Sequence, residues 1–235
     1  MHAILEFLRG VAVFIAFLAA RFALLLIVLA ALTAVFLAGL AVVRLVGRVK
    51  RRAMRLSRVG GLMWRPGVFY APGHAWLQAS GAGRLRVGLD DLAQHLLSRI
   101  TSVSLPEVGR SFRAGEPIAA IQAGRRQALL PAPVSGRVVA VNRGAQRHPA
   151  RLHADPYSRG WLYVLQPDDD SYTRMPSGEG SRQWFSSEAV RFSRFIEGQL
   201  GLAAADGGEL VAPGPSLLTG GQWHELVETF LKGSD

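Results

Sequence analysis

Few residues in this chain have the types and spacing that chemistry requires. The chain has no cysteine, which excludes a thiol nucleophile, a thiolate metal site and a disulfide. The six histidines are scattered, and His148 and His153 lack the further ligands of a zinc site. No Gly-x-Ser-x-Gly motif is present, nor a carboxylate pair spaced for acid–base work. The sequence therefore predicts no catalytic residue, no metal, no cofactor and no enzyme activity.

One stretch could instead bind a partner. Residues 117–136, PIAAIQAGRRQALLPAPVSG, predict a β-hairpin of two apolar strands around a basic tip at residues 124–127. Arg125 and Arg126 at this tip are candidate docking contacts for an acidic partner surface, because arginine forks suit carboxylates. A merely solvated turn is the alternative, and the sequence leaves both open.

The N-terminal part predicts a membrane anchor, residues 1–66. Residues 10–43 contain a single charge, Arg21, and a main span at about 22–43 is long enough to cross the roughly 30 Å hydrocarbon core. The apolar run is too long for a cleaved signal peptide. A second, shorter span before Arg21 is the alternative, although no Gly, Pro or Asn turn signal supports a hairpin there. Glu6 and Arg9 would then need partners in the lipid.

A basic collar at residues 44–65 comes directly after the predicted span. It carries eight positive charges and no acid, and the rest of the chain after it is almost neutral, although the net charge of the whole chain is +10. The excess marks the cytoplasmic side, which places the C-terminal domain in the cytoplasm at the inner (cytoplasmic) membrane of a bacterium. Setting topology and binding anionic lipid headgroups are both open as roles for the collar. The candidate headgroup residues are Arg44, Arg48, Lys50, Arg51, Arg52 and Arg55. Because the charge is concentrated here, it does not indicate nucleic-acid binding.

From residue 67 the pattern becomes that of a small β-rich domain, predicted at 67–170. Residues 73–88 alternate around a glycine-rich turn, and Asp90 or Asp91 caps a short helix after them. Further strands are expected at 101–105, 117–121, 137–141 and 161–165. A polar linker, formed by Asp168 to Asp170 and the Gly/Ser-rich 176–181, joins the domain to a C-terminal extension, 171–235. This extension holds two amphipathic helices, one around 189–200 and one around 223–231. These helices could pack on the domain or on another subunit.

The order and spacing of several segments resemble the glycine cleavage system H protein, a lipoyl-carrier family, over about residues 73–167. The segments are HAW at 74–76, VGLDDLAQHLLSRI at 87–100, VSLPEVGRSFRAGEPIAAI at 103–121, PVSGRVVAVN at 133–142 and ADPYSRGWLYVLQP at 154–167. The resemblance implies a mainly β hammerhead, or barrel-sandwich hybrid, with flanking helices. It also implies a structural role for His74 and places the carrier site at the 117–136 hairpin.

The carrier residue itself is replaced. Counting back from Pro133, the lipoyl lysine of the family corresponds to Arg125 and the family's glutamate to Gln122. Lipoylation requires an amine that can lose its proton, which a guanidinium with a pKa above about 12 cannot do. The only lysines are Lys50 and Lys232, both far from the hairpin in sequence. The resemblance is thus to a degenerate carrier.

These observations support three functional hypotheses. The first is a non-enzymatic, membrane-anchored accessory or scaffold subunit of a larger membrane protein complex, for which an energy-transducing complex, respiratory or photosynthetic, is a fitting setting. The second is a membrane-tethered carrier or docking partner of lipoate-dependent enzymes. The third is a lipid-surface protein whose collar is the functional element. Other membrane subunits and anionic lipid headgroups are the expected partners.

Overall fold

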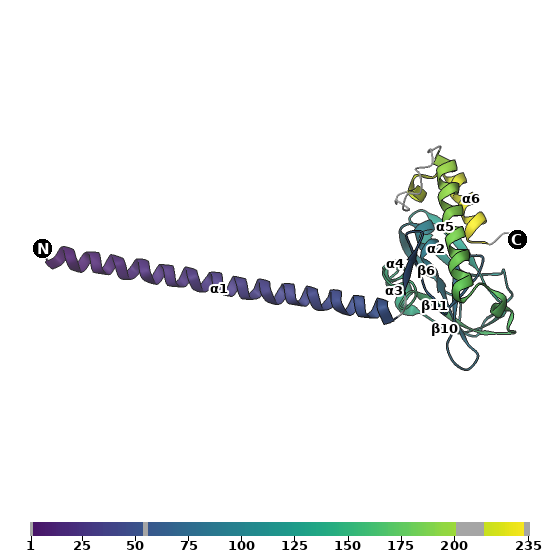
Figure 1. The fold of residues 1–235 in the computed structure, drawn as a ribbon, viewed down its shortest axis with the longest axis horizontal. Helices are drawn as coiled ribbons and strands as arrows, with labels where there is room; N and C mark the ends of the chain where they lie inside the picture. The colour runs from purple at the N-terminus through teal and green to yellow at the C-terminus, as the bar shows by residue number, and fades with distance from the viewer. Residues whose placement is uncertain (1, 54–55, 201–213, 233–235) are drawn as a thin grey trace. The chain divides into compact units, whose positions relative to one another are not determined.

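The structure is a computed structural model that describes residues 2–53, 56–200 and 214–232. Within the N-terminal helix it describes side chains only at 9–10, 14–15, 17–18 and 21–42. The chain divides into two compact units, residues 1–54 and 55–235. The first unit is one long helix, and the second is a β-rich domain with flanking helices (Figure 1).

The first unit consists of α1 (His2–Ala53), which continues without a break past Arg21. The alternative of a hairpin with two spans is therefore wrong. Among the described residues, Arg21–Val42 is the one helical segment long and apolar enough to cross a membrane, and its side chains are all exposed. This segment differs by one residue at each end from the predicted span. The evidence for spanning is its length and composition, which a signal sequence near the N-terminus would share.

The larger sheet of the second unit has six antiparallel strands in the order β3-β4-β5-β11-β10-β7. Its strands are β3 (Phe69–Tyr70), β4 (Ala75–Ala79), β5 (Leu85–Leu89), β7 (Ser111–Phe112), β10 (Gly136–Val141) and β11 (Trp161–Pro167). The predicted hairpin at 73–88 is the β4–β5 pair, in register Ala75↔Leu89 to Ala79↔Leu85. The predicted closing strands are β10 and β11.

The smaller sheet has three antiparallel strands in the order β6-β8-β9. They are β6 (Ile100–Ser104), β8 (Pro117–Ala123) and β9 (Arg126–Pro131). Ile118, Ile121, Ala128 and Leu130 from β8 and β9 are buried and belong to the same apolar core as the larger sheet. The fold is thus mainly β, with two antiparallel sheets sharing one core, as the sequence predicts.

A third, two-stranded sheet was not expected. It consists of β1 (Ser57–Val59) and β2 (Leu62–Trp64), joined by Gly60 and Gly61, whose φ angles of 56° and 82° favour glycine. Leu62 is fully buried in the core of the domain. The compact domain therefore begins near residue 55, and the collar predicted at 44–65 extends too far. Its basic residues obscured the alternating apolar positions between them.

Short helices connect some of the strands. Asp90 caps α2 (Asp91–Leu97), and its carboxylate accepts a hydrogen bond from the Ala93 amide at 2.9 Å. Asp91 instead reaches back to β2, where its carboxylate accepts a hydrogen bond from the Met63 amide at 2.8 Å. Asn142 caps α3 (Arg143–Arg147), which leads into α4 (Ala150–Ala154).

The C-terminal extension packs on the domain, which settles the question left open by its sequence. It contains η1 (Ser171–Arg174), α5 (Gly178–Leu200), η2 (Gly214–Leu217) and α6 (Gly220–Phe230). The apolar faces of α5 and α6 are buried in the same core as the sheets, through Phe185, Ala189, Phe192, Ile196, Trp223, Leu226, Val227 and Phe230. The polar linker predicted at 176–181 is too long, because α5 begins at Gly178 and Ser181 within it is buried. The Ser181 hydroxyl accepts a hydrogen bond from the Trp64 indole at 3.2 Å.

Candidate functional site

The hairpin of β8 and β9 turns more tightly than the sequence indicates. Ala123 pairs with Arg126 and Gln122 with Gln127, so only Gly124 and Arg125 form the turn. Gly124 has a φ of 62°, as a two-residue hairpin turn of the II′ type requires at its first position. The Gln122 side chain donates a hydrogen bond to the Gly124 carbonyl at 3.0 Å. The tip thus consists of two residues, and a side chain of β8 holds its backbone.

The two arginines of the hairpin have different environments. Arg125 is exposed, and its side chain makes no hydrogen bond or ion pair with the described residues. Arg126 is half-buried, because its guanidinium donates hydrogen bonds to the Pro215 carbonyl at 3.4 Å and to the Leu218 carbonyl, and lies 5.7 Å from the centre of the Trp223 ring. Arg126 therefore fastens the hairpin to η2 and α6, which corrects its assignment as a docking residue. Arg125 alone stays a candidate.

A group of charges, of which all but one are mostly buried, lies between the β strands and α5. His74 is fully buried in the loop between β3 and β4 and has an unusual φ of 57°. Its Nδ1 lies 2.9 Å from Asp90 Oδ2, and its Nε2 lies 3.5 Å from Glu188 Oε2 on α5. Glu188 also pairs with Arg191, at 2.9 Å. We call these four residues the His74 cluster.

The His74 cluster holds its imidazole in the charged form. Burial lowers the pKa of His74, but the charge and hydrogen bond of Asp90, with the weaker contribution of Glu188, outweigh it and raise the pKa to about 9. The ring also lies near aromatic neighbours, 5.4 Å from Trp184 and 6.3 Å from Phe230 between ring centres. His74 is thus enclosed by the β strands and the C-terminal helices in an environment that favours its charged form, which fits a structural role.

We expect the unfolding free energy to fall as pH rises, because His74 then loses its proton. Since the pKa in the folded state (about 9) exceeds the unfolded value of about 6.5, the folded state binds more protons between these two pH values. The stabilisation is complete below about pH 6.5 and is lost as pH rises through about 9, amounting to about 3 kcal/mol of unfolding free energy. Urea unfolding of the full chain in detergent at both pH values measures it.

A matched variant isolates the contribution of His74 to this pH dependence. His74→Asn removes the titrating group, and asparagine tolerates a positive φ better than most residues do. The variant should lose most of the fall between pH 6.5 and 9, whereas His148→Asn, at an exposed position, should keep it. An equal pH dependence in wild type and His74→Asn would show that His74 is not the cause.

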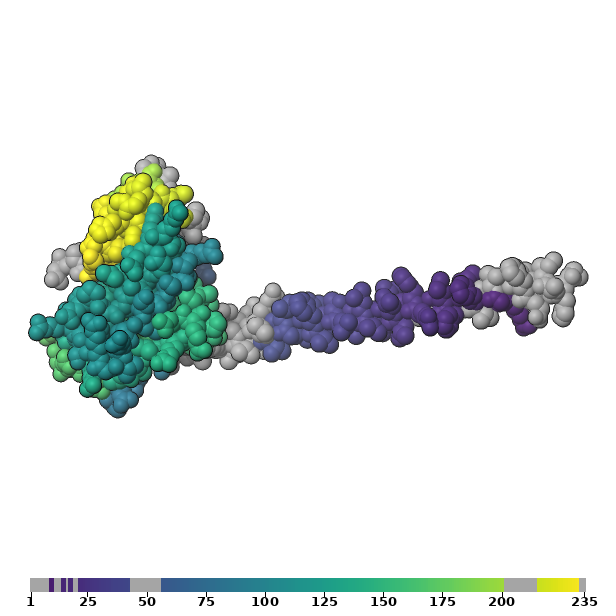
Figure 2. All heavy atoms as spheres, turned by 180° about the vertical axis from the view of Figure 1, so that it is seen from behind, coloured from purple at the N-terminus to yellow at the C-terminus, as the bar shows by residue number. Residues whose placement is uncertain are grey.

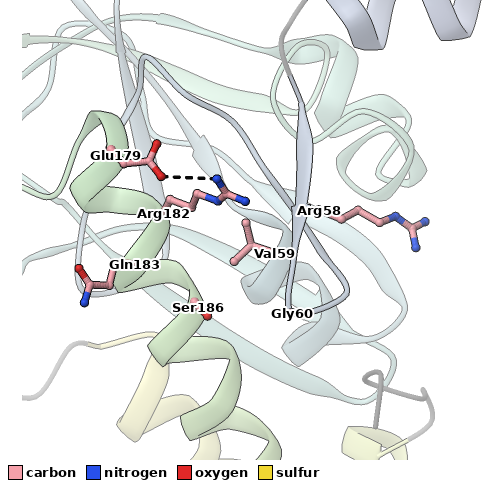
Figure 3. Close-up of a pocket in the computed structure, with 7 residues that line it drawn as sticks. All are labelled: Arg58, Val59, Gly60, Glu179, Arg182, Gln183 and Ser186. Carbon is pink, nitrogen blue, oxygen red and sulfur yellow. Dashed lines mark hydrogen bonds and ion pairs between the residues drawn. The ribbon is translucent and has the colours of Figure 1, made fainter. Parts of the chain in front are cut away.

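Two surface depressions formed by described residues do not bring catalytic groups together. One, with a volume of about 500 Å³, lies between the β1–β2 turn and α5. In Figure 3 the Arg58 side chain points away from it, and Arg182 turns to Glu179, at 3.5 Å. A second, of about 360 Å³, is lined mainly by apolar residues of the loop after β6 and of β8, with Glu107 and Arg110 at its edge. Within the described ranges no three His, Asp or Glu side chains are placed to hold a metal ion.

Two antiparallel sheets share one core, and the smaller sheet carries an exposed two-residue hairpin turn, so the fold defines a small β domain with a projecting hairpin. A family model described as "Glycine cleavage H-protein" matches residues 68–180. The glycine cleavage system H protein of Mycolicibacterium vanbaalenii is 38% identical over 102 residues, which is 43% of this chain and 78% of that protein. That of Stenotrophomonas maltophilia is 39% identical over 93 residues, 40% of this chain and 71% of that protein. The chain belongs to the glycine cleavage H-protein family.

A solved structure is also similar to part of the chain. The crystal structure of a glycine cleavage system H protein from Mycobacterium marinum is 32% identical and covers 53% of this chain and 99% of its own, with a TM-score of 0.47. The helix α1 lies outside the family match, as do most of α5 and all of α6.

Sequence reasoning missed the role of the C-terminal helices in the site. Neither Glu188 nor Arg191 was predicted as a site residue, yet Glu188 faces His74, and the Arg191 guanidinium lies 4.5 Å from the centre of the Phe230 ring. Glu188, whose side chain is 13% exposed, sits one position before the buried Ala189, so an acid beside an apolar stripe was the available signal.

Proposed function

We propose that this protein is a membrane-anchored, non-lipoylated member of the H-protein family that serves as an accessory or scaffold subunit of a larger membrane protein complex. The observation that carries the proposal is Arg125, which occupies the exposed turn where the resemblance places the lipoyl lysine. A guanidinium keeps its proton at physiological pH and cannot attack an activated acyl group. The domain framework is retained, while the acceptor group is absent.

The anchor and its flanking charges supply the second part of the proposal. The proposed span is Arg21–Val42, which is long and apolar enough to cross a membrane, and the basic residues between 44 and 55 favour a cytoplasmic location for the β-rich domain that comes after them. Glu6, Arg9 and Arg21 in or beside this helix would be costly in lipid, and a multisubunit complex would supply partners for them. For this reason we propose an energy-transducing complex, respiratory or photosynthetic, as the setting.

The exposed Arg125 is proposed as the docking contact for an acidic surface of that complex. Its guanidinium, which pairs with none of the described residues, can form a bidentate ion pair with a carboxylate, and a tight two-residue turn limits the entropy that docking costs. The remaining hairpin is held to η2 and α6 through Arg126, so the tip is presented in a fixed position.

Co-purification from gently solubilised native membranes tests the proposed function. A C-terminally tagged chain should be recovered with other membrane subunits at a fixed ratio. Arg125→Gln should lower the recovery of the subunit that contacts the hairpin, whereas Arg84→Gln, which removes an exposed arginine from the β4–β5 turn, should not. Recovery of a lone monomer would contradict the accessory role.

We expect the purified protein to carry no lipoyl group. Co-expression with a lipoate ligase and excess lipoate should leave the intact mass at the 25.4 kDa of the sequence, because the hairpin presents no amine. Arg125→Lys is the matched variant, since it places an amine at the same exposed turn, and an adduct on it alone would trace the loss to this residue. An adduct on the wild-type protein, measured by mass spectrometry, would revive the carrier hypothesis.

A further inference from the structure

A second basic surface lies on the domain itself, on the segment that carries α3 and α4. Residues 143–159 contain four arginines and one aspartate. The two helices contact each other, and Figure 2 shows their green segment on the surface of the domain. We call Arg143, Arg147 and Arg151 the α3–α4 basic face.

The α3–α4 basic face has no acidic counterpart among the described residues. Arg143 and Arg147 are exposed, and Arg147 Nε donates to the Arg143 carbonyl at 3.3 Å rather than to a carboxylate. The single acid of the segment, Asp155, lies 3.2 Å from Arg159 Nε. Three guanidiniums are therefore left without internal neutralisation in the part of the chain that the structure describes.

The composition of this face favours a lipid over a protein partner. Protein interfaces depend on aromatic or aliphatic anchors that fill pockets. Leu152, the one large apolar residue of α3 and α4, is fully buried. Among the described residues, no large hydrophobic side chain between Leu129 and Val190 is exposed. Charge without an apolar anchor suits a layer of anionic headgroups, whose phosphates arginine can bind through two parallel hydrogen bonds.

The segment directly after α4 contacts the strands with which the domain begins. The Tyr157 hydroxyl, three residues after α4, donates to the Met63 carbonyl of β2 at 2.8 Å, and Met63 pairs with Arg58 of β1. The guanidinium of Arg65 donates to the Tyr157 carbonyl as well. Only three residues separate Ala53 at the end of α1 from Ser57, a chain length of at most about 14 Å. A domain joined to an anchor by so short a connection is held at a high local concentration near the headgroups.

We propose that the α3–α4 basic face binds anionic lipid headgroups on the membrane in which α1 is anchored. The inference rests on the proposed anchor. The folded domain would then contact the headgroups through this face, in addition to the contact expected of the basic residues between 44 and 55. Such a contact is electrostatic and weakens as salt shortens the screening length.

The test uses the full chain in lipid nanodiscs, and the absence of cysteine permits a single label. Gln146→Cys on α3 carries an environment-sensitive nitrobenzoxadiazole dye, and His224→Cys on α6 is the reference position. Discs of phosphatidylcholine alone are compared with discs that also contain phosphatidylglycerol. We expect the dye at 146, but not at 224, to become brighter and shift to the blue in anionic discs, and high salt to reverse the change.

Two triple variants, each with three arginines replaced by glutamine and therefore with the same net charge, show whether the α3–α4 basic face causes the dye response. Replacing Arg143, Arg147 and Arg151 with Gln should weaken docking roughly a hundredfold, since each arginine near an anionic surface contributes about fivefold. Replacing Arg84, Arg113 and Arg194, three exposed arginines outside the face, should leave the dye response unchanged.

The outcomes separate this inference from the proposed function. A chain that fails to enter the discs overturns the anchor and, with it, this inference. A chain that enters without a dye response in anionic discs, or with the same response in both triple variants, overturns only the lipid contact. A response that requires added native membrane proteins also overturns it and assigns the face to an acidic protein.

Discussion

Replacing Asp90 with alanine should lower the unfolding free energy of the domain by about 3–5 kcal/mol, the usual cost of removing one partner of a buried ion pair. Asp90 and His74 are both fully buried, and their side chains are 2.9 Å apart. The substitution would leave the imidazole with Glu188 at 3.5 Å as its nearest carboxylate. It would also remove the N-cap of α2, which is worth about 1 kcal/mol.

Urea unfolding of the full chain in detergent measures this loss through tryptophan fluorescence. All five tryptophans lie between residues 64 and 223, so the signal reports on the β-rich domain. Asp168→Ala removes an exposed aspartate and should change the unfolding free energy by less than about 0.5 kcal/mol. If Asp90→Ala is as stable as Asp168→Ala, the His74 cluster contributes nothing to stability.

Replacing Phe230 with alanine should cost about 3–5 kcal/mol, the range for deleting a fully buried aromatic ring. Phe230 is the last residue of α6, and its ring centre lies 5.9 Å from that of Phe192 and 5.6 Å from that of Phe195. It also contacts Arg191 of the His74 cluster through the face of its ring. The substitution should therefore release α6 as well as destabilise the core.

Limited proteolysis and urea unfolding together measure this effect. Leu217→Ala in η2 is the control, because Leu217 is 64% exposed, and it should be nearly neutral. Faster cleavage after α5 in Phe230→Ala, together with a lower unfolding free energy, would support the packing of the extension on the domain. If Phe230→Ala matches Leu217→Ala in both measurements, α6 is not part of the core and is available to a partner.

Many of the strands and helices could be predicted because they depend on local sequence patterns. The alternation at 73–88, the cap at Asp90 and the strands around 117–130 each depend on residues that are close in sequence, and the structure contains them with shifts of a few residues. The β1–β2 hairpin was missed because its strands are only three residues long and because Arg58, with the flanking Arg55 and Arg65, made the segment resemble a continuation of the basic collar. The start of α5 was missed because glycine and serine are typical of a linker, whereas burial of Ser181 against Trp64, 117 residues earlier, offsets their low helix propensity.

The sequence by itself determined what chemistry is absent and where an anchor can lie. The lack of cysteine, the arginine at position 125 and the uncharged run from 22 to 43 are properties of composition and order, which folding does not change. Only the tertiary structure decided which charges are available. It binds Arg126 to the backbone of η2 and α6, brings Glu188 to the buried His74, and leaves Arg125 exposed. These pairs are distant in sequence, and their contact depends on packing of the whole core, which no local pattern encodes.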